Sequence, residues 1–420
     1  MTVVCAWRFG IKSPLRRFQA SSTLDSRQMM NIAEIRTRLH AIPNPSLGLY
    51  LHIPFCRVRC QFCAFYVQPQ QEEKIHAFLE GLTTELQLYS QELGLGTIPV
   101  TTVYFGGGTP TALSVNQLAK ILETIQQEFA VSSDAEISVE AHPGTVDLKS
   151  LETLRSKGFN RLSIGAQSFD DQELTQLGGR SMSEATNMAM NSARRAGFEN
   201  LSLDLMYGFP GQTRESWQGT LDATVALKSN HLSCYAFTVE EGSHFHQKVQ
   251  QGRAGSVDEE EQARLATITT QFLHQAGYNQ YEISNFCQPG FACQHNLRYW
   301  QGESYLGMGP SAQSFVSGVR FGNIGDLDVY CRTLKQGTVP VDQWEILDCR
   351  QIQRERIVFG LRTIQGVNLQ QIQSLEKSDP GWALAYQGMK AQELLTESEG
   401  IVRLTTKGTL FADTVAVALL

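Results

Sequence analysis

Three cysteines, Cys56, Cys60 and Cys63, stand close together with the spacing C-x3-C-x2-C. They follow a short apolar segment, residues 49–53, which reads as a buried strand. Three thiolates on one short loop can hold three corners of a cubane 4Fe–4S cluster and leave the fourth iron open. An open iron can be chelated by a second cofactor, whereas clusters with four cysteine ligands usually transfer electrons only. The spacing therefore predicts a cluster that takes part in chemistry.

Zinc is the first alternative for these thiols. A structural zinc site needs four ligands, and His52 is the one candidate nearby in the sequence for the fourth position. Three buried thiols without any metal are the second alternative. The residues that follow in the chain favour the cluster over both.

The cysteine run resembles the signature of the radical S-adenosylmethionine (radical SAM) superfamily. The residues that lead into it, YLHIPFC at 50–56, resemble the start of the cluster loop in the oxygen-independent coproporphyrinogen III oxidase family. This resemblance extends from about residue 50 to the C-terminus. It implies a 4Fe–4S cluster bound by the three cysteines, S-adenosylmethionine as a second cofactor, and an α/β fold with a partial (β/α)6 TIM-like barrel.

Length and composition set limits on the class of protein. A chain of 420 residues can bury a large core, and we expect one large domain and one smaller domain. Charged residues make up 18% and the net charge is −7, which argues against a nucleic-acid-binding surface. No apolar stretch is long enough to predict a transmembrane helix. Six of the nine cysteines are scattered, unlike a secreted disulfide framework, so we expect a reducing, cytoplasmic setting.

Residues 1–44 are predicted to be an extension before the folded core. Between residues 1 and 24 the chain has four basic residues and no acidic one: Arg8, Lys12, Arg16 and Arg17. This composition resembles an organelle transit peptide. The alternative is an upstream mis-assigned start, with translation beginning at Met29 or Met30, and we favour it because the family resemblance begins near residue 50.

The middle of the chain, residues 45–286, alternates strand and helix patterns. The strand candidates are 48–53, 100–105, 136–140, 161–164, 201–206 and 232–237. Between them, Leu, Ile and Phe recur every three or four residues, which is typical of amphipathic helices. This alternation predicts parallel strands joined by right-handed crossovers. In the family resembled, six such units form three quarters of a barrel, with the site at the carboxyl ends of the strands.

The pattern changes after Gly277. Residues 278–286 read as one more strand or extended segment, and 287–341 as a connecting segment. Helices dominate residues 342–420, and a short strand pair precedes the final helix. We therefore expect a small, mainly helical, winged-helix-like C-terminal domain, similar to that of the oxidase family. We expect it to pack against the barrel rather than to bind nucleic acid.

Candidate cofactor residues follow the predicted strands. After the second strand comes Gly-Gly-Gly-Thr-Pro at 106–110, where glycines let the backbone approach a ligand. Alone, such a turn could equally bind phosphate or merely make a tight turn. In the family resembled it contacts the methionine amino group of S-adenosylmethionine, which implicates Gly107, Gly108 and Thr109.

Four polar side chains extend this set. Glu140 ends the third strand and can accept from an ammonium group, and Gln167 after the fourth strand suits ribose hydroxyls. The guanidinium of Arg180 can bind a carboxylate in a bidentate way, and Asp204 at the end of the fifth strand can bind a ribose diol. Each alone also reads as an ordinary polar residue at a strand end. Together, and with the resemblance, they supply partners for the amine, carboxylate and ribose of S-adenosylmethionine.

Three details qualify the match. Arg180 follows Leu-Gly-Gly at 177–179, where the family pattern has Leu-Gly-Arg, so one extra glycine separates this sequence from the pattern that would aim its side chain. The resemblance places Tyr50 and Phe62 near the cofactor, although simple packing explains both residue types equally well.

Two features distinguish members of the family. The oxidases resembled have a further cysteine two residues after the third ligand, where this sequence has Phe65, and this form resembles the HemW-type heme chaperones. The run HNLRYW at 295–300 matches the H-N-x-x-Y-W motif of that subgroup. It implies heme as a ligand, with His295 as an axial ligand of the iron and Tyr299 and Trp300 beside the porphyrin. Cys293 is a weaker candidate for the same role.

For this motif too there is a structural alternative, in which His295 and Asn296 connect the barrel to the C-terminal domain through hydrogen bonds. The resemblance as a whole implies a heme chaperone that binds heme, the cluster and S-adenosylmethionine and transfers heme to an acceptor protein. It also implies an electron donor such as flavodoxin or ferredoxin. The alternative is an oxygen-independent coproporphyrinogen III oxidase, which decarboxylates coproporphyrinogen III to protoporphyrinogen IX. A radical SAM methylase would need a substrate motif of its own, and we find none.

Overall fold

A curved twelve-stranded sheet forms the main body of the computed structural model, which describes residues 35, 37–38, 43–178 and 182–420. The strand order is β14-β13-β12-β11-β1-β4-β5-β6-β7-β8-β10-β9. Its central strands are parallel and match the six predicted ones: β1 (Leu47–Ile53), β4 (Val100–Gly107), β5 (Val131–Ala141), β6 (Arg161–Gln167), β7 (Asn200–Tyr207) and β8 (His231–Ala236). The predicted α/β partial barrel is therefore confirmed.

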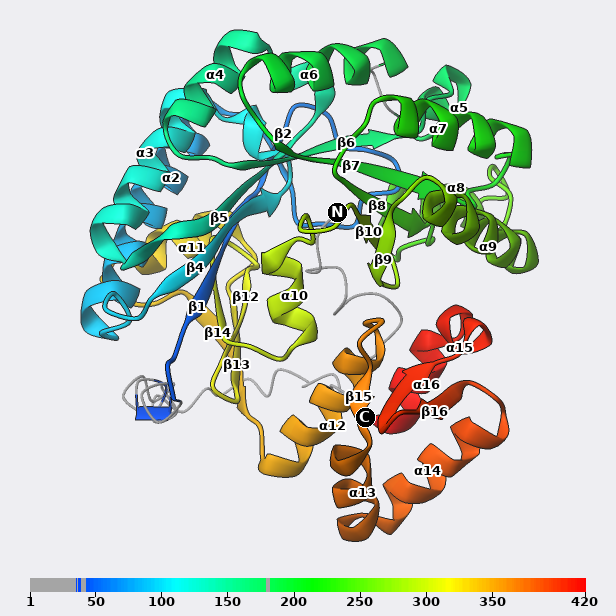
Figure 1. Cartoon of the computed structure of the whole chain (residues 1–420). Coiled ribbons are helices and arrows are strands. Elements are labelled where there is room, and N and C mark those ends of the chain that lie inside the picture. The colour runs from blue at the N-terminus through cyan, green and yellow to red at the C-terminus, as the bar shows by residue number, and fades with distance from the viewer. Residues whose placement is uncertain (1–34, 36, 39–42, 179–181) are drawn as a thin grey trace.

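Helices cover the outer face of this sheet (Figure 1). They are α2 (Glu72–Gln87), α3 (Val115–Glu128), α4 (Leu148–Ser156), α6 (Ser183–Arg195), α7 (Arg214–Ala226) and α9 (Glu259–Gln275). The helix α3 illustrates why they form: Ser114 and Gln117 make a capping box at its start, and Leu118, Leu122 and Ile125 bury one face. The same apolar periodicity that predicted these helices places them against the sheet.

The segment between the barrel and the C-terminal domain contains more sheet than its sequence indicated. Residues 287–341 were expected to be a connection, but β11 (Tyr305–Met308) pairs in parallel with β1 and extends the sheet. Three antiparallel strands follow it: β12 (Gln313–Val316), β13 (Val319–Asn323) and β14 (Val341–Ile346). At the other edge, residues 279–287 form a hairpin of β9 (Asn279–Glu282) and β10 (Asn285–Cys287) rather than a single strand. The short strands of this region carry too few residues for a clear alternating pattern.

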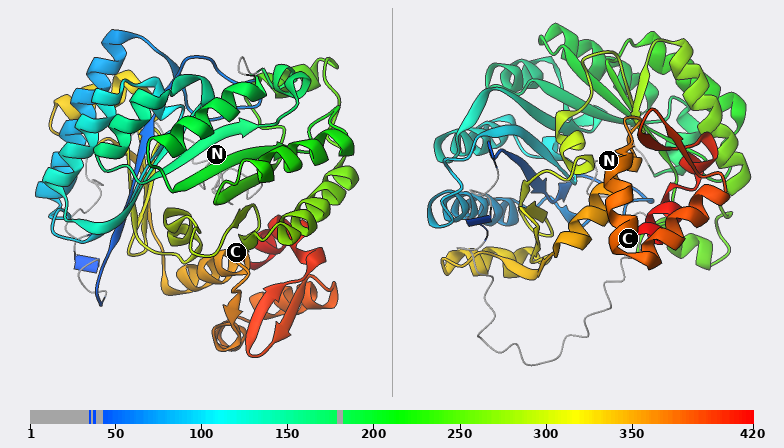
Figure 2. Two further views of the ribbon diagram at one scale, coloured as in Figure 1. Left: turned by 45° about the horizontal axis from the view of Figure 1, so that its top comes forward. Right: turned by 60° about the horizontal axis from the view of Figure 1, so that its bottom comes forward.

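One short helix, α10 (Gln294–Trp300), lies inside the curve of the sheet, and both further views show it there (Figure 2). The remaining shorter elements are β2 (Phe55–Cys56), β3 (Gln68–Pro69), the π-helix Leu88–Glu92, the 3-10 turns Pro110–Ala112 and Pro143–Thr145, α5 (Asp171–Gln176), α8 (His244–Gln250) and α11 (Leu327–Lys335). No helix within the described residues is both long enough and apolar enough to cross a membrane.

The C-terminal domain has its own core. It consists of five helices and a small antiparallel sheet: α12 (Cys349–Leu361), α13 (Leu369–Ser378), α14 (Pro380–Ala391), α15 (Thr406–Leu410) and α16 (Ala412–Leu419), with β15 (Val367–Asn368), β17 (Ile401–Leu404) and β16 (Leu395–Ser398). Trp382 and Tyr386 are buried at the centre of this core. The domain joins the barrel edge by backbone hydrogen bonds from Ile283 to Arg362 and from Ile364 to Tyr281, each 3.2 Å long.

Candidate cofactor site

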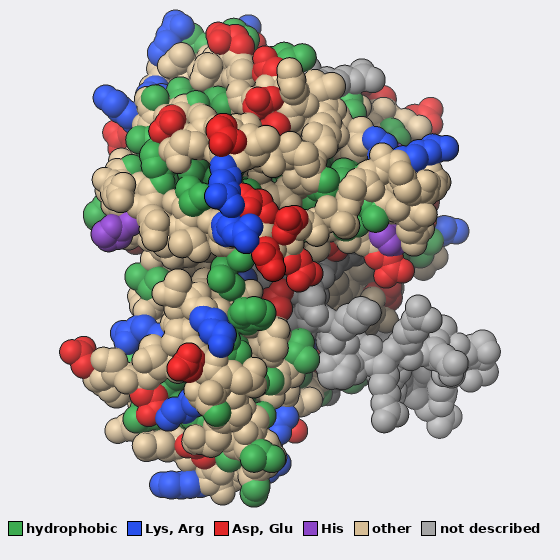
Figure 3. Space-filling model, turned by 90° about the vertical axis from the view of Figure 1, so that its right-hand side faces the viewer, with side chains coloured by type: hydrophobic (Ala, Val, Ile, Leu, Met, Phe, Trp, Pro, Cys, Tyr) green, Lys and Arg blue, Asp and Glu red, His purple; other side chains and the backbone are tan. Residues whose placement is uncertain are grey.

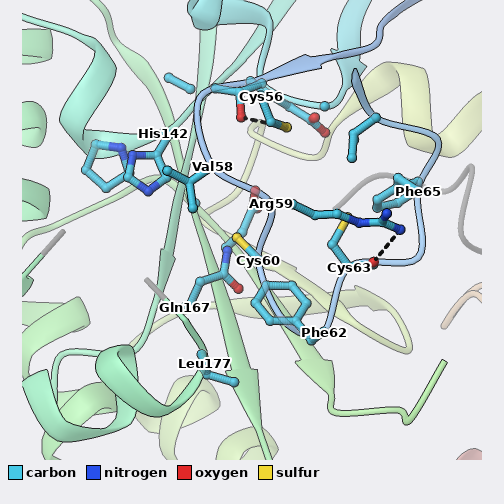
Figure 4. A pocket seen from close by; sticks show the side chains of 18 of the residues that line it. Cys56, Val58, Arg59, Cys60, Phe62, Cys63, Phe65, His142, Gln167 and Leu177 are labelled. Carbon is cyan, nitrogen blue, oxygen red and sulfur yellow. Dashed lines mark hydrogen bonds between the residues drawn. The ribbon is translucent and has the colours of Figure 1, made fainter. Parts of the chain in front are cut away.

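One pocket collects the three cysteines and most of the predicted cofactor residues. It has a volume of about 150 Å³ and lies at the carboxyl ends of the parallel strands. Around it stand Tyr50, Cys56, Cys60, Phe62, Cys63, Gly107, Gly108, Thr109, Glu140, Gln167 and Asp204. Figure 4 shows the three cysteines on the loop after β1, with Phe62 and Gln167 beside Cys60. Arg180 lies outside the described residues, so its predicted role stays a prediction.

The cluster loop is held by the glycine-rich turn after β4. Backbone N–H groups of Gly108 and Thr109 donate to the carbonyls of Ile53 and Phe55, both at 2.8 Å. The Thr109 hydroxyl also lies 3.5 Å from the Cys56 sulfur. These bonds fix the chain on both sides of Pro54 and so set where the first cysteine stands.

The glycines of this turn are needed for close packing. A Cβ on Gly108 would lie 2.7 Å from the Phe55 carbonyl oxygen, and one on Gly107 would lie 2.7 Å from Nδ1 of His52. Gly107 also has a φ of +108°, which only glycine adopts without strain. Both glycines line the pocket, as predicted, but their lack of a side chain serves the cluster loop rather than only the approach of a ligand.

His52 does not supply the fourth ligand of a zinc site. Its ring is buried, Nε2 donates to the Tyr66 carbonyl at 3.0 Å, and Nδ1 accepts from the Tyr50 hydroxyl at 3.2 Å. Within the residues that the structure describes, no group of three or more His, Cys, Asp or Glu side chains has a geometry that could hold a single metal ion. Three thiols around one pocket fit three corners of a cubane cluster whose fourth iron stays open.

Burial raises the pKa of two of the pocket thiols. The pKa of Cys56 rises to about 11, mainly by burial and against the effect of its contact with Thr109. The pKa of Cys60 rises to about 12, again mainly by burial and then by the charges of the other two cysteines. Iron binds the thiolate form, so cluster binding must release these protons.

The polar pocket residues are positioned by neighbours inside the barrel. The Tyr104 hydroxyl donates to Oε1 of Glu140 at 2.9 Å. The Ser163 hydroxyl lies 3.1 and 3.2 Å from the two carboxylate oxygens of Asp204, which is almost fully buried. Gln167 has a φ of +66°, a left-handed conformation that costs a non-glycine residue of order 1 kcal/mol. Strain of this kind at a pocket residue supports a functional role for Gln167.

Two pocket residues with titratable side chains were not predicted from the sequence. Arg59 stands between the first and second cysteines and its guanidinium donates to the Cys63 carbonyl at 3.4 Å (Figure 4). His142 follows Glu140 by two residues, and burial and then the charge of Arg57 lower its pKa. Both lie within or beside motifs that the sequence did reveal, so proximity to those motifs was the available signal.

The histidine of the HNLRYW run lies elsewhere. His295 is fully buried inside the barrel; Nδ1 is hydrogen-bonded to the Thr102 hydroxyl at 2.8 Å, and Nε2 to the Tyr299 hydroxyl at 3.0 Å. Burial first, and then the charges of Arg298 and Arg161, lower its pKa to about 3. In this conformation neither ring nitrogen is open to a heme iron, so heme ligation by His295 requires at least one of these hydrogen bonds to break.

Helix α10 as a whole is fastened to the barrel strands. Glu136 of β5 accepts the backbone N–H groups of Gln294 and His295, both at 3.1 Å, and the Cys293 thiol at 3.4 Å. The Arg298 guanidinium donates to the Thr101 hydroxyl at 2.7 Å and to the Ser46 carbonyl at 2.9 Å. The buried Cys293 is therefore also a poor candidate for a heme ligand in this arrangement.

Trp300, at the end of the motif, contacts the C-terminal domain. Its ring lies 6.3 Å from that of Phe359 in α12, measured between centroids, and the Arg362 guanidinium lies 4.8 Å from the indole centroid. The sequence alternative assigned the connection between the domains to His295 and Asn296, but His295 bonds to β4 and to its own helix, and Trp300 makes the contact instead.

Comparison with known proteins gives consistent matches. The profile of the Radical SAM superfamily matches residues 50–224. "Heme chaperone HemW" of Bacillus subtilis (strain 168) is 33% identical over 378 residues, which cover 88% of this chain and 98% of that protein. "Radical S-adenosyl methionine domain-containing protein 1, mitochondrial" of Mus musculus is 33% identical over 377 residues, 86% of this chain and 83% of that protein.

A solved structure supports the same fold. The coproporphyrinogen III oxidase (HemN) from Escherichia coli, a radical SAM enzyme, superimposes with a TM-score of 0.79 at 25% sequence identity. The match covers 91% of this chain and 92% of that protein. The similarity therefore includes the C-terminal domain as well as the barrel.

Proposed function

Because this chain belongs to the HemW family of the radical SAM superfamily, we propose that it is a heme chaperone that binds heme and transfers it to an acceptor protein. The observation that carries this proposal is the similarity to proteins named heme chaperone HemW over nearly the full length of both chains. Phe65, where the oxidases resembled have a cysteine, supports the same choice. Cytoplasmic location and an electron donor such as flavodoxin or ferredoxin are parts of this proposal.

The pocket residues would hold the two cofactors of the superfamily. Cys56, Cys60 and Cys63 would bind the 4Fe–4S cluster, which when bound supplies an electron to S-adenosylmethionine. Glu140 would accept from the ammonium group of S-adenosylmethionine, and Asp204 would bind its ribose hydroxyls. Gln167, Thr109 and the turn glycines would complete the binding site.

Heme needs space apart from this pocket. A groove of about 990 Å³ lies between α9, the outer side of β8 and β10, and α15. A hollow of about 290 Å³, lined by Trp300 and Arg362, shares several residues with it. Ligand sites usually have volumes of about 300–1,000 Å³, so this junction is of suitable size for a porphyrin.

Charge at this junction limits how a heme can lie. Acidic side chains gather beside the junction of the barrel and the C-terminal domain (Figure 3), and Glu259 and Glu260 line the groove. Carboxylates repel heme propionates, whereas the Arg362 guanidinium in the adjoining hollow can attract them, although it already pairs with Asp413 at 3.4 Å. A heme at this junction would therefore point its propionates away from α9 and toward the hollow.

The runner-up is an oxygen-independent coproporphyrinogen III oxidase, which the structural similarity to HemN favours. Two assays on the cluster-loaded protein under anaerobic conditions separate the proposals. The chaperone proposal predicts a saturable Soret band on titration with heme, and no protoporphyrinogen IX from coproporphyrinogen III with S-adenosylmethionine and a reductant. Product formation without saturable heme binding would reverse the choice.

A further inference from the structure

Inside the barrel, a tyrosine hydroxyl is hydrogen-bonded to Glu140. The Tyr104 hydroxyl, which is almost completely buried, donates to Oε1 of Glu140 at 2.9 Å. Gly106 leaves room for this pair, because a Cβ there would lie 3.1 Å from Oε2 of Glu140 and 3.1 Å from the Tyr104 ring. The direction of the carboxylate at the pocket wall thus depends on where the Tyr104 ring stands.

The Tyr104 ring is in turn held by helix α10. The His295 ring stacks on it with centroids 5.2 Å apart and planes 29° apart. Tyr50 lies 6.4 Å from both rings, also stacked, and all three side chains are buried. These contacts leave the phenol of Tyr104 little freedom to turn away from Glu140.

His295 is itself fixed on two sides. Its two ring nitrogens are hydrogen-bonded to Thr102 of β4 and to Tyr299 one turn further along α10. Burial lowers the pKa of His295 and raises that of Tyr104 well above its usual value, so the stack stays neutral and the phenol stays a donor. A continuous set of contacts therefore connects the HNLRYW motif to a carboxylate of the cofactor pocket.

We propose that Tyr104 and His295 are positioning residues of the cofactor site. Tyr104 orients the Glu140 carboxylate toward the ammonium group of S-adenosylmethionine, and His295 holds Tyr104 in place from behind. The inference rests on the proposed use of S-adenosylmethionine, but it does not depend on heme binding. It assigns the histidine of the motif to the cofactor site rather than to heme.

The test uses Tyr104→Phe, which removes the hydroxyl and keeps the ring stack. In cluster-loaded protein, titration with S-adenosylmethionine is followed by the change that it causes in the electron paramagnetic resonance spectrum of the reduced cluster. Loss of a hydrogen bond to a carboxylate predicts an increase of about tenfold in the dissociation constant. His295→Gln should raise it by a smaller factor, about threefold, because it acts through Tyr104. Tyr278→Phe is the matched control, since this tyrosine donates to the Ser229 carbonyl far from the pocket.

A double variant separates positioning from general damage. In a Glu140→Ala background, which removes the acceptor of the Tyr104 hydroxyl, Tyr104→Phe should add little further loss, because the two residues act through one interaction. Unchanged affinity in Tyr104→Phe, or a full additional loss in the double variant, would overturn the inference. Should Tyr104→Phe fail to retain its cluster, Thr102→Val, which loosens His295, carries the same test with the same two outcomes.

Heme titration of these proteins keeps this inference separate from the proposed function. Normal heme binding by the wild type, together with unchanged cofactor affinity in Tyr104→Phe, would refute the positioning role alone. Absence of heme binding by the wild type would refute the chaperone proposal and leave the positioning role to be decided by the cofactor titrations.

Discussion

The cluster loop and helix α10 each carry a short sequence motif, but the structure uses the two motifs in opposite ways. The cysteines of the loop are only partly buried and surround an open pocket. Most residues of α10 are buried, and the helix is hydrogen-bonded to Glu136, Thr102 and Ser46. A motif gives the residue types, whereas burial and hydrogen-bond partners decide whether those residues can reach a ligand.

The largest expected effect tests the loop side of this comparison. Cys60→Ser should lose most of the 4Fe–4S cluster, because two thiolates and a hydroxyl are a poor ligand set for iron. Iron and acid-labile sulfide per chain, with the visible absorption of the cluster, measure this after anaerobic reconstitution. Cys349→Ser, at an exposed cysteine outside the pocket, should keep the full cluster. A normal cluster in Cys60→Ser would show that the loop is not the cluster site.

The next effect tests the α10 side. Arg298→Ala removes a buried guanidinium that bonds to Ser46, Thr101 and the Ser304 carbonyl. We therefore expect the free energy of unfolding, measured in urea, to fall by roughly 3 kcal/mol. Arg264→Ala is the control, because the ion pairs of Arg264 with two glutamates of α9 are half exposed. We expect this substitution to lower the free energy of unfolding by only about 0.5 kcal/mol. Equal effects of the two substitutions would mean that α10 is not fastened as described.

Gly108→Ala tests how the barrel supports the cluster loop, because Gly108 lies in the turn after β4 that holds this loop. A Cβ there would lie 2.7 Å from the Phe55 carbonyl, so the loop must shift, at a cost of about 1–3 kcal/mol. We expect weaker cluster retention on dilution under chelator, with the barrel still folded by circular dichroism. In Gly219→Ala the new methyl group meets nothing within 4 Å, and the helix should gain up to about 1 kcal/mol. Cluster retention equal to wild type in Gly108→Ala would contradict the packing role of this glycine.

The smallest effect is a pH dependence. Burial lowers the pKa of His295 in the folded protein to about 3, while the unfolded chain keeps a value near 6.5. The unfolded state therefore binds the proton first as pH falls, and stability decreases progressively between pH 6.5 and pH 3. At pH 5.5, one unit below the pKa of this histidine in the unfolded chain, its protonation there should lower the free energy of unfolding by roughly 1.4 kcal/mol.

His295→Gln isolates that contribution, since other buried groups such as His231 also titrate. Urea unfolding of the wild type and the variant at pH 7.5 and pH 5.5 gives the difference directly. We expect the wild type to lose more stability than the variant over this range. Identical pH profiles would show that His295 is more accessible to solvent than its contacts indicate.

How far the sequence alone could predict this molecule depended on the distance between interacting residues. The six central strands and the cysteine pocket were predictable, because each strand has a local pattern and each motif follows a strand end. The burial of His295 was not, because it depends on Thr102, 193 residues away. The need for glycine at 107 and 108 had the same origin, since it comes from contacts with the cluster loop.

The edges of the sheet show the same limit. The pairing of β11 with β1 joins segments that are more than 250 residues apart, and a four-residue strand gives no periodicity to detect. Likewise, the sequence shows the motif of the short helix α10 but does not predict where this helix lies in the fold. Local patterns thus predicted the scaffold and its site, whereas long-range contacts decided the role of the second motif.

The most direct test of the account is an anaerobic heme titration of cluster-loaded wild-type protein and His295→Gln, followed at the Soret band. The account predicts saturable heme binding by both proteins with closely similar spectra, because His295 is buried and bonded to Thr102 and Tyr299. Loss or marked change of the Soret band in the variant, with S-adenosylmethionine affinity unchanged, would contradict it and identify His295 as a heme ligand.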